Sequence, residues 1–132
     1  MTHKRSFGFT LIEVLVAATI IVVLASIGIV SYRNIGISVR DSKRKADLDT
    51  VRSALVLYRS EQGSYPSYSG QTRANFTNMA GDLESDGYLS DPLPSDPRDN
   101  ASYFYTYSSS GTTFTLEATL EEDDSVYQLT NP

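Results

Sequence analysis

The sequence contains no cysteine and no tryptophan, and its single histidine is His3. Without cysteine, the chain has no disulfides, no thiolate metal ligands and no thiol nucleophile. His3 belongs to a short N-terminal segment that we expect to be removed. The processed chain would then also lack an imidazole for a Ser-His triad, a general base or a metal site. These absences argue against an enzyme.

Charge is distributed unevenly along the 132 residues. Residues 1–8 carry a net charge of +2, and residues 9–32 hold a single charged side chain. Residues 33–52 carry +3, whereas residues 53–132 carry −9. The chain therefore begins with a short basic segment, continues through an apolar and then a basic stretch, and is acidic over its remaining residues.

Residues 9–32, FTLIEVLVAATIIVVLASIGIVSY, form a long apolar run. As a helix this run would be about 36 Å long, enough to cross a hydrocarbon layer of about 30 Å. It is apolar on all sides, which is typical of a helix in a bilayer or in a fully buried bundle. A cleaved secretory signal fits less well, because the run is too long and no small-residue cleavage pattern closes it.

Glu13 is the one charged residue in this run. A carboxylate at the centre of a membrane span costs about 2.5–3.5 kcal/mol, and less near an end. Glu13 could therefore lie at the headgroup level near the start of the helix, where an acid is tolerated. It could equally serve a function that requires a positively charged partner, and physics alone leaves both interpretations open.

Residues 4–13, KRSFGFTLIE, stand directly before the rest of the apolar run. This string resembles the leader and mature N-terminus of type IV pilins and type II secretion pseudopilins. The resemblance is strong over residues 4–35 and continues more weakly through residues 46–66. It implies the pilin fold, a long N-terminal helix with a C-terminal sheet.

The resemblance also implies roles for individual residues. A prepilin peptidase would remove residues 1–8, with their basic side chains Lys4 and Arg5, by cleaving between Gly8 and Phe9 on the cytoplasmic side. The same enzyme would N-methylate Phe9. Glu13 would pair with the Phe9 ammonium of a neighbouring subunit in a homopolymer built through residues 9–32. An inner-membrane assembly platform and its ATPase would be further partners.

The basic residues that flank the apolar run bear on its orientation. Counting them places the C-terminal side in the cytoplasm, because more arginines and lysines follow the run than precede it. The resemblance implies the reverse, and we follow it because the cleavage site must face its peptidase. We expect a single-pass inner-membrane precursor with its head outside the cytoplasm, and then a cell-surface or periplasmic filament.

Beyond Tyr32 the sequence predicts an amphipathic continuation of the helix over residues 33–62. Apolar residues recur at helical spacing in this stretch, at Leu48, Val51, Ala54, Leu55 and Tyr58. Gly63 fits a helix C-cap, with a proline shortly beyond it. A continuous helix is favoured over one that loses its structure between Gly28 and Gly36, although glycine weakens helices.

Residues 63–132 are expected to form a globular head packed on the second half of the helix. Residues 64–100 are rich in turn-forming residues and are predicted to form loops with one short helix near residues 76–84. Alternating apolar residues predict strands over residues 103–107, 114–120 and 126–129. The predicted fold is α+β, a long N-terminal helix packed against a three-stranded antiparallel sheet.

A basic cluster lies early in the second half of the helix and comprises Arg40, Lys43, Arg44 and Lys45. It could contact nucleic acid or anionic lipids. No aromatic residues interleave it and the processed chain is acidic, so a solvated role or contacts with acidic neighbouring subunits are favoured.

Acidic residues in the head could bind Ca²⁺ through carboxylate oxygens. The candidates are Asp91, Asp96, Asp99 and Asn100, or the run Glu121 to Asp124. Major secretion pseudopilins often bind calcium in a C-terminal loop, and Asp96-Pro97 resembles the start of that region. The Trp-Gly pair and Gly/Asp-rich loop that usually follow are missing, so acidic turns in water are favoured and no cofactor is expected.

The sequence thus predicts a structural subunit of a type IV pilus-like filament. The alternative is the major pseudopilin of a type II secretion system, and a less favoured one is a membrane-anchored binding module that never polymerises. The sequence does not indicate whether the filament serves adhesion, motility, DNA uptake or secretion.

Overall fold

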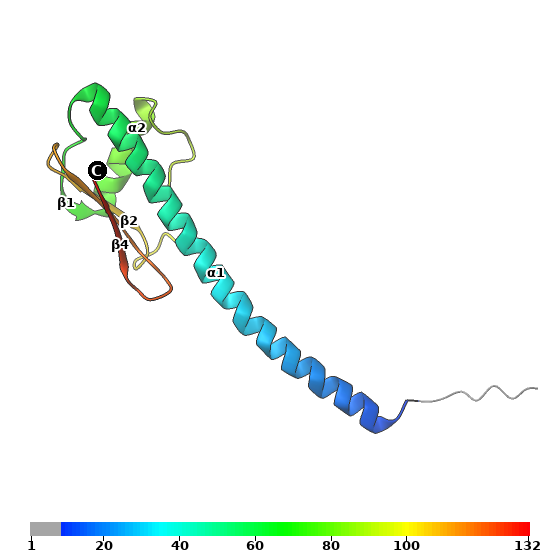
Figure 1. Ribbon diagram of the computed structural model, residues 1–132. Helices are drawn as coiled ribbons and strands as arrows, with labels where there is room; N and C mark the ends of the chain where they lie inside the picture. The colour runs from blue at the N-terminus through cyan, green and yellow to red at the C-terminus, as the bar shows by residue number, and fades with distance from the viewer. Residues whose placement is uncertain (1–8) are drawn as a thin grey trace, which may run out of the picture. The chain divides into compact units, whose positions relative to one another are not determined.

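The computed structural model describes residues 9–132 and divides the chain into a unit that ends at Gly36 and a second unit, Ile37–Pro132 (Figure 1). The long helix α1, Leu11–Gln62, contributes to both. It is helical through Gly28 and Gly36, as the prediction of a continuous helix required.

In the first unit, the side chains of residues 9–29 are exposed. By length and composition α1 is able to span a membrane, and its most apolar 18-residue window has a mean hydropathy of 2.7 with none of it buried. Apolar side chains that are exposed all round a helix require a lipid or protein environment. The first unit is therefore suited to a membrane or to a bundle of helices from other subunits.

In the second unit, α1 provides one wall of a single hydrophobic core. Its buried residues include Leu48, Val51 and Leu55, and Tyr58 packs against the core from its edge. These are the positions that the helical spacing predicts. The helix ends at Gln62, and Gly63 follows in the left-handed region with φ +83°, donating its N–H to the Arg59 carbonyl over 2.8 Å. The predicted C-cap is thereby confirmed.

The sheet has four strands rather than the predicted three. The strands are β1 (Tyr68–Thr72), β2 (Tyr105–Ser109), β3 (Phe114–Thr119) and β4 (Val126–Thr130), in the order β1-β2-β3-β4 with every pair antiparallel. The three predicted strands are β2 to β4. Tyr105, Tyr107, Phe114, Leu116 and Ala118 turn their side chains into the core.

Strand β1 was missed because its sequence, YSGQT, has the composition of a loop. Its pairing with β2 is irregular, with Tyr68 opposite Ser109 and Thr72 opposite Tyr107. Two tertiary contacts hold it in place. The Tyr68 hydroxyl donates to Asp82 over 2.6 Å, and the Gln71 amide donates to Thr106 over 2.8 Å.

Helix α2, Arg73–Ser85, lies between β1 and the long segment that leads to β2. Thr72 caps its N-terminus by accepting the Asn75 N–H over 3.1 Å. The buried residues Phe76, Met79, Ala80 and Leu83 follow helical spacing. The predicted helix is confirmed and begins three residues earlier than residue 76.

Replacing Leu48 by alanine is expected to destabilise the head by about 3 kcal/mol, because this fully buried side chain would leave a cavity in the core. Leu57→Ala is the matched control, since Leu57 lies on the same helix and is half exposed. Thermal unfolding of the full chain in detergent, followed by circular dichroism, measures both. Equal losses in the two variants would contradict this packing.

Candidate functional site

The start of α1 forms a reciprocal cap around Thr10 and Glu13. The Thr10 N–H and hydroxyl both donate to the Glu13 carboxylate over 3.3 Å, and the Glu13 N–H donates to the Thr10 hydroxyl oxygen over 3.3 Å. This is a capping box, which satisfies backbone donors at the first helical turn. The sequence signature of this cap, Thr-x-x-Glu before an apolar run, is present at Thr10 and Glu13, and sequence reasoning missed it.

Glu13 remains exposed in this arrangement, and so does Phe9, whose relative exposure is 86%. Within the described part of the chain, no basic side chain pairs with Glu13. The cap places the carboxylate beside the backbone where residues 9 and 10 meet. The expected leader residues Lys4, Arg5 and Gly8 lie outside the described residues.

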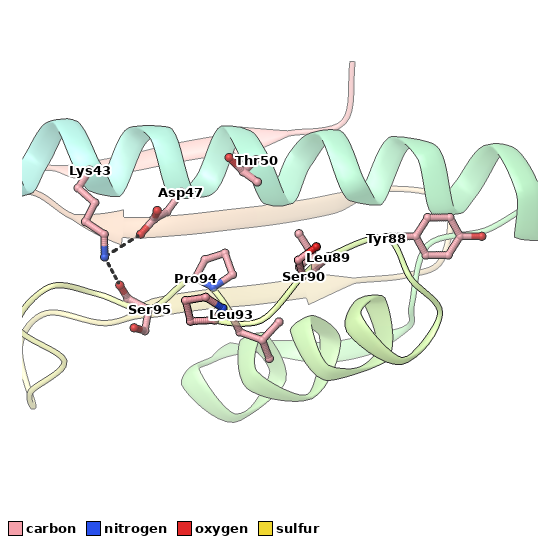
Figure 2. A pocket seen from close by; sticks show the side chains of 10 residues that line it. Lys43, Asp47, Thr50, Tyr88, Leu89, Ser90, Leu93, Pro94 and Ser95 are labelled. Atoms are coloured by element: carbon pink, nitrogen blue, oxygen red, sulfur yellow. Dashed lines mark hydrogen bonds and ion pairs between the residues drawn. The ribbon is translucent and has the colours of Figure 1, made fainter.

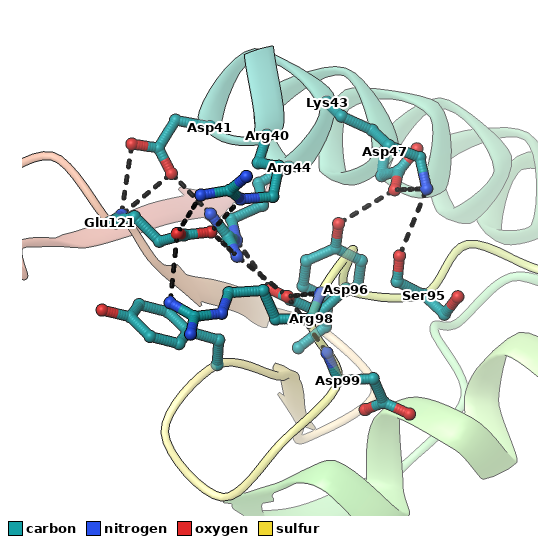
Figure 3. Close-up of polar contacts among 12 residues, drawn as sticks. Arg40, Asp41, Lys43, Arg44, Asp47, Ser95, Asp96, Arg98, Asp99 and Glu121 are labelled. Carbon is teal, nitrogen blue, oxygen red and sulfur yellow. Dashed lines mark hydrogen bonds and ion pairs between the residues drawn. The ribbon is translucent and has the colours of Figure 1, made fainter. Parts of the chain in front are cut away.

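A second polar site lies within the head, around the buried guanidinium of Arg44 (Figure 3). Arg44 is completely buried and contacts carboxylates from three segments of the chain. It donates to Asp96 over 2.7 and 2.9 Å, to Asp41 over 2.6 Å and to Glu121 over 2.7 Å. We call these four residues the Arg44 cluster.

Two further arginines complete the surroundings of Glu121. Arg40 binds its carboxylate through two hydrogen bonds of 2.7 Å, and Arg98 donates to it over 3.2 Å. The Asp41 carboxylate in turn accepts the backbone N–H groups of Glu121 and Glu122. The cluster thus attaches the β3–β4 turn and the segment around Asp96 to α1.

The electrostatic surroundings keep these acids ionised. The hydrogen bonds from Arg40 have the largest effect on Glu121 and lower the pKa of its carboxyl group. Burial opposes this effect, but the hydrogen bond from Arg44 adds to it, and the pKa of Glu121 is lowered to about 2. Burial is the largest single effect on Asp96 and opposes its ionisation. The hydrogen bonds and charge of Arg44, together with the backbone N–H groups of Arg98 and Asp99, outweigh burial, so the pKa of Asp96 also lies below its ordinary value. Burial disfavours the charged form of Arg44, yet its carboxylate partners hold the pKa above the ordinary value.

These contacts correct two sequence-based expectations. Two of the four residues of the basic cluster are engaged within the chain and are not free for neighbouring subunits. Arg44 is buried, and Arg40 is paired with Glu121 of the same chain. Asp96 and Glu121 are not solvent-exposed acids of surface turns, because their side chains are only 0% and 3% exposed. Sequence reasoning missed the pairing because its partners are 52 and 77 residues apart.

The calcium candidates do not gather into a metal site among residues 9–132. No group of three or more acidic or histidine side chains suited to a metal ion occurs in that range. Asp96 and Glu121 direct their oxygens to arginines instead.

A groove of about 530 Å³ runs beside α1 in the head (Figure 2). Lys43, Asp47 and Thr50 line it from the helix, and residues 88–90 and 92–95 line it from the opposite side. We call it the loop groove. Lys43 lies at one end, 3.7 Å from Asp47 and 3.5 Å from the Ser95 carbonyl oxygen.

Comparisons with known proteins bear on both parts of the chain. Residues 3–29 match the prokaryotic N-terminal methylation motif, and residues 37–125 match the type II secretion system (T2SS) protein G family. The chain is 29% identical over 117 residues to the type II secretion system core protein G of Pseudomonas aeruginosa, which covers 85% of this chain and 80% of that protein. No solved structure matches.

Proposed function

Because the chain belongs to the type II secretion system protein G family, we propose that the filament it forms is the pseudopilus of a type II secretion system. The chain is a pilin-like subunit that polymerises, and its family is structural rather than enzymatic. The match over residues 37–125 carries the proposal, because it covers the second half of α1 and the head as far as the start of β4. The match over residues 3–29 supports processing of the N-terminus.

We further propose how the precursor matures. A prepilin peptidase cleaves between Gly8 and Phe9 and methylates the new amino group of Phe9. Methylation retains its positive charge. The head then lies outside the cytoplasm, and an assembly platform with its ATPase draws the subunit from the inner membrane into a periplasmic filament.

Glu13 is proposed to select the axial position of each incoming subunit. The carboxylate is exposed at the first turn of α1, beside residues 9 and 10. When a neighbouring helix replaces lipid around it, an unpaired acid would be costly, and the Phe9 ammonium of another subunit would remove that cost. The apolar surface of α1 would then pack against neighbouring helices in place of lipid.

The N-terminal peptide of the native protein tests this proposal. Mass spectrometry is expected to find a peptide that begins at Phe9 and carries one added methyl group. An intact leader in cells that contain the peptidase would contradict the proposal and favour a membrane-anchored module. Deletion of the gene is expected to abolish secretion through the type II system, whereas a loss of surface pili with secretion intact would indicate a type IV pilus subunit.

A further inference from the structure

Two grooves flank the same stretch of α1 within the head. The loop groove lies on one side, with Lys43 and Asp47 at its helix wall. The second groove, about 370 Å³, is lined by Asp49, Arg52, Ser53, Val56 and Pro132, and we call it the tail groove. At 100° per residue, Lys43 and Asp47 project from one side of the exposed face of α1 and Asp49 and Arg52 from the other.

The charges on the two sides follow opposite orders along the helix. On the loop-groove side a cation, Lys43, precedes an anion, Asp47. On the tail-groove side an anion, Asp49, precedes a cation, Arg52. Two copies of α1 that lie parallel can therefore place opposite charges together twice, whereas antiparallel copies would place like charges together.

These charges have capacity for a further partner. The Lys43 side chain is 54% exposed and its contact with Asp47 is long, at 3.7 Å. Asp49 is exposed, and neither Asp49 nor Arg52 forms an ion pair within the part of the chain that the structure describes. Asp47 also accepts the Tyr105 hydroxyl over 2.9 Å, which holds its carboxylate at the groove.

We propose that the loop groove of one subunit receives the tail-groove edge of a second copy of this chain in the filament. Lys43 then pairs with Asp49 of the second copy, and Asp47 pairs with its Arg52. The pairs join residues six and five positions apart, so the two parallel helices are staggered by about 8 Å. This contact rests on the proposed filament function and adds to it a surface within the head.

The walls of the loop groove suit an arginine side chain. Leu89, Leu93 and Pro94 offer apolar surface along which the methylene stem of Arg52 can lie. The Asp47 carboxylate and the Ser95 carbonyl oxygen offer acceptors for its guanidinium at the end of the groove. The two surfaces are different, so the contact is heterologous. Because each copy is also displaced along the helix axis, the contact repeats from subunit to subunit as an open helix and not as a closed ring.

A charge swap in the full chain tests this contact. Lys43→Glu and Asp49→Lys are each expected to lower the yield of sheared filaments roughly tenfold, because like charges then meet at every subunit contact. The double variant Lys43→Glu/Asp49→Lys is expected to recover most of the wild-type yield. Glu84→Lys is the matched control for Asp49→Lys, since Glu84 is an exposed acid on α2 outside both grooves, and its yield is expected to stay near wild type.

Thiol cross-linking supplies a second test, because the chain has no native cysteine. Ser53 lines the tail groove and Ser95 the loop groove. In intact filaments, a short bismaleimide is expected to join Ser53→Cys/Ser95→Cys subunits into a ladder of multimers. Each single-cysteine variant should give no ladder. The control Ser53→Cys/Thr112→Cys, with its second thiol in the turn between β2 and β3, should give none either.

The outcomes separate this contact from the filament proposal. Suppose that the wild-type protein is processed and forms filaments, but the charge variants give the same filament yield as Glu84→Lys and no cross-linked ladder forms. The proposed groove contact is then wrong, and the proposed filament function is unaffected. If both single variants lose filaments and the double variant does not recover them, the contact is also wrong. If wild-type cells make no filament, the proposed function itself fails.

Discussion

Filaments are expected to disappear in Glu13→Ala, while the head keeps its fold and the leader is still removed. The carboxylate is needed only when a second subunit arrives, and Glu13 is not one of the residues that form the core of the head. Electron microscopy of sheared filaments, together with the N-terminal peptide of the membrane-bound protein, measures both results. Because a missing ion pair recurs at every subunit, we expect loss rather than a partial decrease.

Two further variants separate the charge of Glu13 from its role in the capping box. Glu13→Gln retains an acceptor for the Thr10 N–H and hydroxyl but removes the charge, so it should also lose filaments. Thr10→Ala removes the cap at a cost of about 1 kcal/mol and retains the charge, so filaments should persist. Filaments in Glu13→Gln, with none in Thr10→Ala, would show that the cap rather than the ion pair is required.

The Arg44→Met variant is expected to destabilise the head by about 3–5 kcal/mol. Methionine removes the guanidinium from the centre of the Arg44 cluster and leaves buried carboxylates without their shared partner. Unfolding of the full chain in detergent, followed by near-ultraviolet circular dichroism of its tyrosines, measures the loss.

Arg52→Met is the matched control for Arg44→Met. It removes an arginine from the same helix that forms no ion pair among the described residues, so in separated subunits its effect should be within about 0.5 kcal/mol. Arg44→Lys should lie between the two, because an ammonium keeps the charge but cannot reproduce the planar set of donors. Equal stability of Arg44→Met and Arg52→Met would contradict the cluster as a stabilising element.

The Arg44 cluster also predicts the effect of acid on the head. The pKa of Glu121 is lowered from 4.5 to about 2, so its contribution to stability is complete above pH 4.5 and is lost as the pH falls toward 2. The melting temperature of the wild-type head should therefore decrease over this range. In Arg44→Met the decrease should be smaller, because part of the stabilisation of the ionised form is already gone.

Much of this protein was determined by short-range patterns that its sequence displays directly. The apolar run 9–32, the helical spacing of Leu48, Val51 and Leu55, and the cap at Gly63 each depend on neighbours within one or two helical turns. The same holds for β3, where alternation of apolar and polar residues identifies the buried face. The fold class followed from these features and from the N-terminal string that resembles pilins.

Tertiary structure decided the features that depend on partners far away in the chain. Strand β1 is decided by its pairing with β2, since within YSGQT only the end residues Tyr68 and Thr72 favour strands and Gly70 disfavours them. Arg44 is buried because Asp41, Asp96 and Glu121 come together from three segments, and without them the same arginine would be a solvated charge. The sequence shows which side chains carry charge. Whether a charged side chain is buried and paired depends on which partners the fold brings within hydrogen-bond distance of it.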